Sequence, residues 1–176
     1  VVWQCGALYH AALADRLPQN TPGLQLTAFV QDMTAVYRAA DLVISRAGAG
    51  TLSELACAGM PALLVPSPNV AEDHQTHNAR AFERAGAAVV LPESQLAELN
   101  AHVLELMANQ DRRAALSAAA YTLALPGATE AIVEHIGTTG NVIDAPGLKP
   151  EHYSVFDCAM GARPIAAMGH VHMMAA

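Results

Sequence analysis

The sequence predicts an α/β fold: a doubly wound, parallel, Rossmann-like sheet followed by an irregular C-terminal tail. Short apolar segments alternate with helical segments from residue 1 to about residue 136, and this order favours a parallel sheet. The loops between the segments are short. The run Leu-Val-Ile at residues 42–44 is apolar at every position, as expected for a strand that helices cover on both faces.

Five strands are expected, each from an apolar or alternating run. They cover residues 1–5, 24–29, 42–44, 61–65 and 87–91. Helical patterns follow every strand. They cover residues 7–17, 33–40, 49–59, 75–84 and a stretch from Pro92 onward, with shorter helices at 112–123 and 128–136. Asp32 is a suitable N-cap for the second helix, and Gly59 is a suitable left-handed residue at the end of the third.

The pattern changes after about Gly137. Residues 137–141 are typical of a linker, and the rest of the chain to residue 176 shows little helical or strand periodicity. About 40 residues is near the lower limit for independent folding. We therefore expect two parts: a ligand-binding domain over residues 1–136, and a linker and tail over residues 137–176 that is poorly ordered or packs against the first part.

Composition argues against several classes of protein. The net charge of −7 and the lack of any run of Lys or Arg argue against a nucleic-acid partner. Three widely spaced cysteines without C-x-x-C spacing argue against a disulfide framework and fit a reducing cytoplasm. Pro61 and Pro66 interrupt the most apolar stretch well short of membrane length. The opening strand pattern and the 53% hydrophobic content fit a chain that has lost a partner domain.

Residues 46–54 form the strongest candidate site. Gly48 and Gly50 interrupt a buried strand just before a helix, and the free N–H groups at a helix start attract anions such as phosphate. A structural alternative stays open, because Thr51 and Glu54 also fit a capping box. The pattern G-x-G-x-x-G is not completed. The loops at residues 30–33 and 67–75 leave the same edge of the predicted sheet, which favours ligand binding.

Three motifs together resemble a known family. They are Phe-Val-Gln-Asp-Met at residues 29–33, Ser-Arg-Ala-Gly-Ala-Gly-Thr-Leu-Ser-Glu at 45–54, and Leu-Val-Pro-Ser-Pro-Asn-Val-Ala-Glu-Asp-His-Gln-Thr-His-Asn at 64–78. In this order they are similar to the MurG-type bacterial UDP-N-acetylglucosamine:lipid I N-acetylglucosaminyltransferases, over residues 1–136. The resemblance implies the C-terminal, donor-binding half of a glycosyltransferase with the two-domain GT-B architecture.

The resemblance also implies roles for residues of the three motifs. Val30 would meet the uracil, Glu54 would accept hydrogen bonds from the ribose, and Gln75 with neighbouring His74 would reach the sugar. The segment at the diphosphate would consist of Ala49, Gly50, Thr51, Leu52 and Ser53. No catalytic residue, metal site or cofactor is predicted from this chain.

As an expectation from the family, the whole enzyme moves N-acetylglucosamine from UDP-N-acetylglucosamine to lipid I with inversion, forming lipid II for peptidoglycan and thus for cell shape and division. The lipid I acceptor would bind through an N-terminal half. The whole enzyme would be peripheral on the cytoplasmic face of the inner membrane, and the fragment alone would be inactive. The alternatives are another GT-B UDP-sugar enzyme, such as a transferase or a UDP-N-acetylglucosamine epimerase, and a non-catalytic α/β module.

The tail resembles a different protein. Residues 142–152, 155–158 and 168–176 are similar to an internal fragment of adenosylcobalamin-dependent ribonucleotide reductase. The matched part includes neither the radical-site cysteines nor the cofactor-binding domain of that family, so it implies no role for Cys158. Two unrelated resemblances in one chain favour a fusion or sequence-assembly junction between about Gly137 and Val142.

Overall fold

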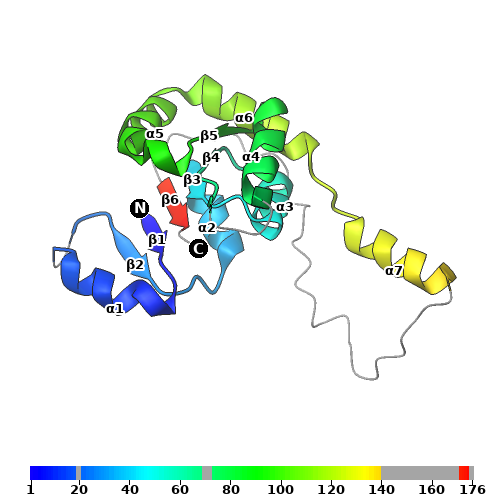
Figure 1. Ribbon diagram of the computed structural model, residues 1–176, viewed down its shortest axis with the longest axis horizontal. Coiled ribbons are helices and arrows are strands. Elements are labelled where there is room, and N and C mark those ends of the chain that lie inside the picture. The colour runs from blue at the N-terminus through cyan, green and yellow to red at the C-terminus, as the bar shows by residue number, and fades with distance from the viewer. Residues whose placement is uncertain (19–20, 69–72, 140–170, 175–176) are drawn as a thin grey trace.

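The computed structural model describes residues 1–18, 21–68, 73–139 and 171–174. These residues form one sheet in which every neighbouring pair of strands is parallel. The order across the sheet is β2-β1-β6-β3-β4-β5 (Figure 1). The strands are β1 Val2–Gln4, β2 Gln25–Thr27, β3 Leu42–Ser45, β4 Ala62–Leu64, β5 Ala88–Val90 and β6 Val171–Met174. The predicted parallel α/β sheet is confirmed.

Helices follow the first five strands in the expected order. They are α1 Ala7–Arg16, α2 Met33–Ala39, α3 Ala49–Ala58, α4 His74–Arg84, α5 Leu99–Ala108, α6 Gln110–Thr122 and α7 Ala128–Thr139. The structure differs from the single helix predicted after Pro92, because a 3₁₀ turn, η2 (Glu93–Glu98), precedes α5. Gln95 has a φ of −108° and a ψ of 17°, which breaks the helical geometry inside this turn.

Two apolar layers form the core, one on each face of the sheet. β3 shows this arrangement directly, because Val43 packs in one layer while Leu42 and Ile44 pack in the other. The first layer includes side chains from α2, α3 and α4: Tyr37, Leu52, Leu55 and Ala79. The second includes side chains from α5 and α6: Leu106 and Leu116. Helices therefore cover both faces of β3, as the apolar run at residues 42–44 predicts.

Both predicted helix-end residues are confirmed. The Oδ1 atom of Asp32 accepts a hydrogen bond from the N–H of Ala35 at 2.9 Å and caps α2. Gly59 ends α3 with a φ of 58° and a ψ of 41°, a left-handed conformation that costs other residues about 1 kcal/mol or more. The N–H of Gly59 donates to the carbonyl of Ala56 at 3.0 Å, and this bond closes α3 at the end away from the candidate site.

Two side chains depart from what their sequence patterns indicate. Asp-Arg-Arg at residues 111–113 is typical of a solvated helix start, but Arg113 is only 7% exposed. Its Nη1 donates to the carbonyls of Leu106 at 2.6 Å and Met107 at 2.5 Å, which belong to the last turn of α5, where the usual helical N–H donors run out. Cys57 is disulfide-bonded, whereas Cys5 is free and buried. A disulfide depends on Cα atoms within about 7 Å, which spacing along the chain cannot reveal.

The tail contributes one strand that the sequence does not predict. In β6, His172 pairs with Val2 of β1 on one side and with Val43 of β3 on the other. β6 thereby joins β2-β1 to β3-β4-β5 in the sheet. Four residues carry too little periodicity to indicate a strand. The expected poor order of the tail falls mainly on residues 140–170 and 175–176, outside the described residues, and the domain boundary at 136 stays a prediction.

We expect His172→Pro to separate the two parts of the sheet. Proline has no N–H, so the variant loses a ladder hydrogen bond to one neighbour, and the proline ring disturbs the strand that β1 and β3 both pair with. Hydrogen exchange should show lost amide protection in β1 and β2, while β4 and β5 keep theirs. His172→Thr retains the N–H and suits a strand, which makes it the matched control. Unchanged protection in β1, or an equal loss in every strand, would contradict this linking role.

Candidate functional site

The candidate site lies at the edge of the sheet where the parallel strands end. The three loops predicted to meet a ligand follow β2, β3 and β4, and loops at the carboxyl ends of parallel strands share one edge. β3 and β4 are neighbours, so their loops begin about 5 Å apart. β2 lies three strand positions from β3, or roughly 14 Å. The loop after β2 must therefore reach back toward β3 to share a ligand with the other two.

A hydrogen bond draws Val30 back in that direction. The N–H of Val30 donates to Oε1 of Gln4 at 2.8 Å, and Gln4 is the last residue of β1. This contact ties Val30, which is 8% exposed, to a strand two positions from β3, or roughly 10 Å away. Because the Val30 N–H is already used, a ligand at this residue would have to meet its carbonyl or its side chain.

The start of α3 is arranged as an open helix N-terminus. Its N-cap residue is Gly48, with a φ of −68° and a ψ of 146°, and no side chain caps the helix. The first backbone bond into the helix runs from the N–H of Leu52 to the carbonyl of Gly48 at 3.0 Å. The preceding N–H groups, those of Ala49, Gly50 and Thr51, lie in the first turn, where the helix offers them no partner. Ala49 and Gly50 are also exposed.

The capping-box alternative is not what the structure contains. Gly48 rather than Thr51 is the N-cap residue, so Thr51 lies inside the first turn. The Oε2 atom of Glu54 accepts a hydrogen bond from the hydroxyl of Tyr37 at 3.1 Å, across the contact between α3 and α2. Glu54 is half-buried and does not fold back on the start of its own helix. The start of α3 therefore remains open, although the spacing of Thr51 and Glu54 fits a capping box.

Leu52 and Ser53 have structural contacts in this segment. Leu52 is 5% exposed and packs in the first core layer. The hydroxyl of Ser53 donates to the carbonyl of Ala49 one turn earlier, at 3.1 Å, while the residue as a whole is exposed. The side chain of Leu52 faces the core and so does not support the predicted contact with a ligand. The places of Leu52 and Ser53 in the site stay predictions.

Residues of α4 connect the loop after β4 with the glycine turn. The Oε1 atom of Gln75 accepts a hydrogen bond from the N–H of Ser67 at 3.0 Å. Asn78, one turn further, donates from Nδ2 to the carbonyl of Ala47 at 3.2 Å. His74 begins α4 and is exposed. The start of α4 is thereby fixed beside the start of α3, so that Gln75 and the glycine turn lie in one region.

Arg46 is part of an ion pair. Its Nη2 lies 2.9 Å from Oε1 of Glu93 in η2, and its Nη1 donates to the carbonyl of Val65 at 3.2 Å. These contacts tie the end of β3 to the residue after β4 and to η2. The guanidinium charge of Arg46 is balanced by Glu93.

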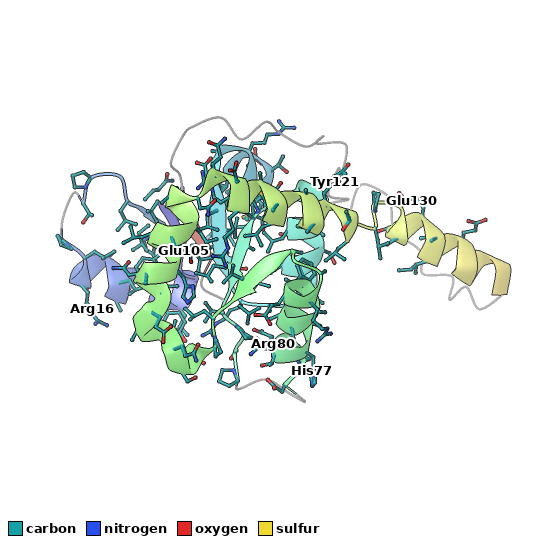
Figure 2. The ribbon with its side chains drawn as sticks, turned by 90° about the horizontal axis from the view of Figure 1, so that it is seen from above. Arg16, His77, Arg80, Glu105, Tyr121 and Glu130 are labelled. Atoms are coloured by element: carbon teal, nitrogen blue, oxygen red, sulfur yellow. The ribbon has the colours of Figure 1, made fainter. Side chains whose placement is uncertain are left out.

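No metal centre forms among residues 1–18, 21–68, 73–139 and 171–174, which hold no cluster of three or more His, Cys, Asp or Glu side chains suited to an ion. His77, three residues after His74, lies on the outer side of α4 (Figure 2).

Three residues of the candidate site were not predicted from the sequence: Gln4, Tyr37 and Asn78. Each acts through a partner 17 to 31 positions away in the chain, and no local pattern signals such a contact.

Comparison with known proteins places this geometry in a family. Residues 1–133 match the family model described as the glycosyltransferase family 28 C-terminal domain. The chain belongs to this family. Its fold is therefore that of a glycosyltransferase domain, and the resemblance stated from the three motifs is confirmed.

Curated relatives of this family 28 domain share one description. Proteins of Salinibacter ruber and Cytophaga hutchinsonii, both named UDP-N-acetylglucosamine--N-acetylmuramyl-(pentapeptide) pyrophosphoryl-undecaprenol N-acetylglucosamine transferase, are 49% and 45% identical over 137 residues. The match covers 77% of this chain but only 37% and 36% of those proteins. The crystal structure of Acinetobacter baumannii MurG is similar, with a TM-score of 0.67 and 32% identity, over 78% of this chain and 40% of that one.

Tyr37 gives the structure a measurable pH dependence. Burial, then the charge of Glu54 and the hydrogen bond to it, raise the pKa of Tyr37 above its ordinary value of 10.0. The stability from this group is therefore fully present below pH 10 and is lost as the pH rises further, because the unfolded chain ionises first. Denaturant unfolding should show that wild type loses about 1.4 kcal/mol per pH unit above pH 10 relative to Tyr37→Phe. Identical pH profiles for the two proteins would contradict this arrangement.

Proposed function

We propose that this domain binds the nucleotide-sugar donor of an inverting glycosyltransferase, which moves N-acetylglucosamine from UDP-N-acetylglucosamine to lipid I to form lipid II in peptidoglycan synthesis. One observation carries the proposal: the uncapped start of α3, with Gly48 as its N-cap, lies at the carboxyl edge of the sheet in a glycosyltransferase family 28 domain. The names of the curated relatives support the choice of donor and acceptor.

The diphosphate of the donor suits the first turn of α3. N–H groups at a helix start favour anions through hydrogen bonds and the helix dipole. In the proposed reaction UDP leaves, so negative charge grows on the diphosphate in the transition state. The N–H groups of Ala49, Gly50 and Thr51 are held in place by the helix before the reaction and would stabilise this charge without reorganising. The exposure of Ala49 and Gly50 supports access for the phosphates.

The uridine would lie between this helix start and the loop after β2. Val30, tied to the end of β1 by Gln4, would meet the uracil through its side chain or carbonyl. Glu54 would accept hydrogen bonds from the ribose, since a carboxylate can take two O–H donors. Its side chain is half-buried, and within the described part of the chain only Tyr37 donates to it. That leaves acceptor capacity on the other oxygen.

The N-acetylglucosamine would lie toward α4. Gln75 can both donate to and accept from sugar hydroxyls. Its Oε1 accepts from the Ser67 N–H, which fixes the amide and leaves the Nε2 donors available for the sugar in this assignment. His74, exposed at the first position of α4, would be a second contact to the same sugar.

The acceptor side of the reaction is assigned outside these residues. The chain spans little more than a third of the length of the curated relatives that it matches, and no described residue is nominated as a general base. No helix among the described residues is long and apolar enough to cross a membrane. Because the acceptor named for the relatives carries an undecaprenyl chain, we propose that the whole enzyme works in the cytoplasm at the surface of the membrane.

Calorimetry with UDP on the full chain tests the donor site. We expect weak, saturable binding at micromolar to millimolar UDP and no transfer by the chain alone. Glu54→Ala should weaken binding about tenfold, because the ribose loses a charged acceptor. Glu130→Ala is the matched control: it removes an exposed carboxylate from α7, which extends away from the body of the domain (Figure 2), and should leave UDP binding unchanged.

The opposite result would be equally clear. If millimolar UDP produced no heat of binding and no protection against thermal unfolding, the domain would be an α/β module without a nucleotide site. If UDP bound but Glu54→Ala and Glu130→Ala behaved alike, the ribose assignment would be wrong while the nucleotide site stood.

A further inference from the structure

Tyr37 and Glu54 form a hydrogen bond between two helices that sequence patterns did not indicate. The hydroxyl of Tyr37, in α2, donates to Oε2 of Glu54, in α3, at 3.1 Å. Tyr37 is 1% exposed and packs in the first core layer, so its ring is held in place from all sides. Glu54 is half-buried. A rigid donor thus holds one oxygen of a carboxylate that reaches the surface beside the open start of α3.

We propose that Tyr37 is a positioning residue for the ribose: its hydroxyl holds Oε2 of Glu54, so that Oε1 is presented as the acceptor for the ribose hydroxyls. This inference rests on the proposed UDP site and adds a residue to it. Within the described residues, Oε1 accepts no hydrogen bond, and an ionised carboxylate has about four acceptor positions. One oxygen can therefore serve the protein while the other serves the ligand.

The cost of ordering a flexible side chain explains why such a contact matters. A glutamate loses up to about 2 kcal/mol of rotamer freedom when it is fixed in one conformation. If folding has already fixed Glu54, ligand binding need not meet that cost, and affinity improves through preorganisation. Packing alone does not require the hydroxyl, because a phenylalanine would fill the same space in the core layer. The hydroxyl is thus explained by its partner.

The phenol of Tyr37 stays protonated and can therefore act as a hydrogen-bond donor. Burial, the charge of Glu54 and the hydrogen bond to it all raise the pKa of the phenol, so Tyr37 keeps its proton throughout the physiological range. The hydroxyl of Tyr37 therefore remains a donor to the carboxylate of Glu54, at 3.1 Å.

The test compares two ligands on two proteins. UDP and 2′,3′-dideoxy-UDP, which lacks both ribose hydroxyls, are titrated by calorimetry into wild type and Tyr37→Phe as full chains. We expect Tyr37→Phe to weaken UDP about fivefold to tenfold and to leave dideoxy-UDP unchanged. Tyr121→Phe removes a hydroxyl from a tyrosine of α6 that is 42% exposed and should alter neither affinity. Figure 2 shows Tyr121 near the end of α6 that leads toward α7.

Each other outcome has a definite meaning. If Tyr37→Phe weakened both ligands equally, the hydroxyl would be structural and the inference would fail; no effect on either ligand would also overturn it. If wild type bound no UDP, the proposed function and this inference would fall together. A second measurement uses wild-type protein only, so it does not depend on whether a variant folds. The ¹³Cζ resonance of Tyr37 should shift when UDP binds but not when dideoxy-UDP binds. Equal shifts with both ligands would contradict the positioning role.

Discussion

Parallel pairing of the strands determines where the loops of this domain meet. Because all pairs are parallel, loops separated by dozens of residues leave the same edge of the sheet without any direct attraction between them. The position of β6 between β1 and β3 makes this edge continuous. The distance between the Val30 loop and the start of α3 therefore depends on a strand drawn from the far end of the chain.

At that edge of the sheet, contacts from neighbouring helices hold the groups around the start of α3 in place. Gly48 begins α3 without a capping side chain, so the first N–H groups have no side-chain acceptor within the helix start. Asn78 fixes the glycine turn through the carbonyl of Ala47, and Tyr37 takes up one oxygen of Glu54. The supporting contacts come from α2 and α4 rather than from α3 itself. Such an arrangement orders the groups before a ligand arrives, which favours binding.

The sequence predicted what depends on local pattern and missed what depends on distant contacts. The apolar run at residues 42–44 and the cap at Asp32 were predictable, because periodicity and capping act over a few residues. Thr51 and Glu54 fitted a capping box and a ligand site equally well, and the structure excludes the capping box because Gly48 is the N-cap and Glu54 accepts from Tyr37. β6 gave no signal, since four residues are too few. The burial of Arg113 was not predictable from its charged neighbours, because its carbonyl partners in α5 lie six and seven residues earlier.

An NMR titration of the ¹⁵N-labelled full chain with UDP tests whether the diphosphate binds at the start of α3. If the diphosphate lies at the start of α3, the amide resonances of Ala49, Gly50 and Thr51 should show the largest shifts, saturating together with that of Val30. Uridine without phosphates should move Val30 and leave the three α3 amides nearly unchanged. Saturable shifts confined to another part of the chain, or α3 amides that do not respond to UDP, would contradict a diphosphate site at the start of α3.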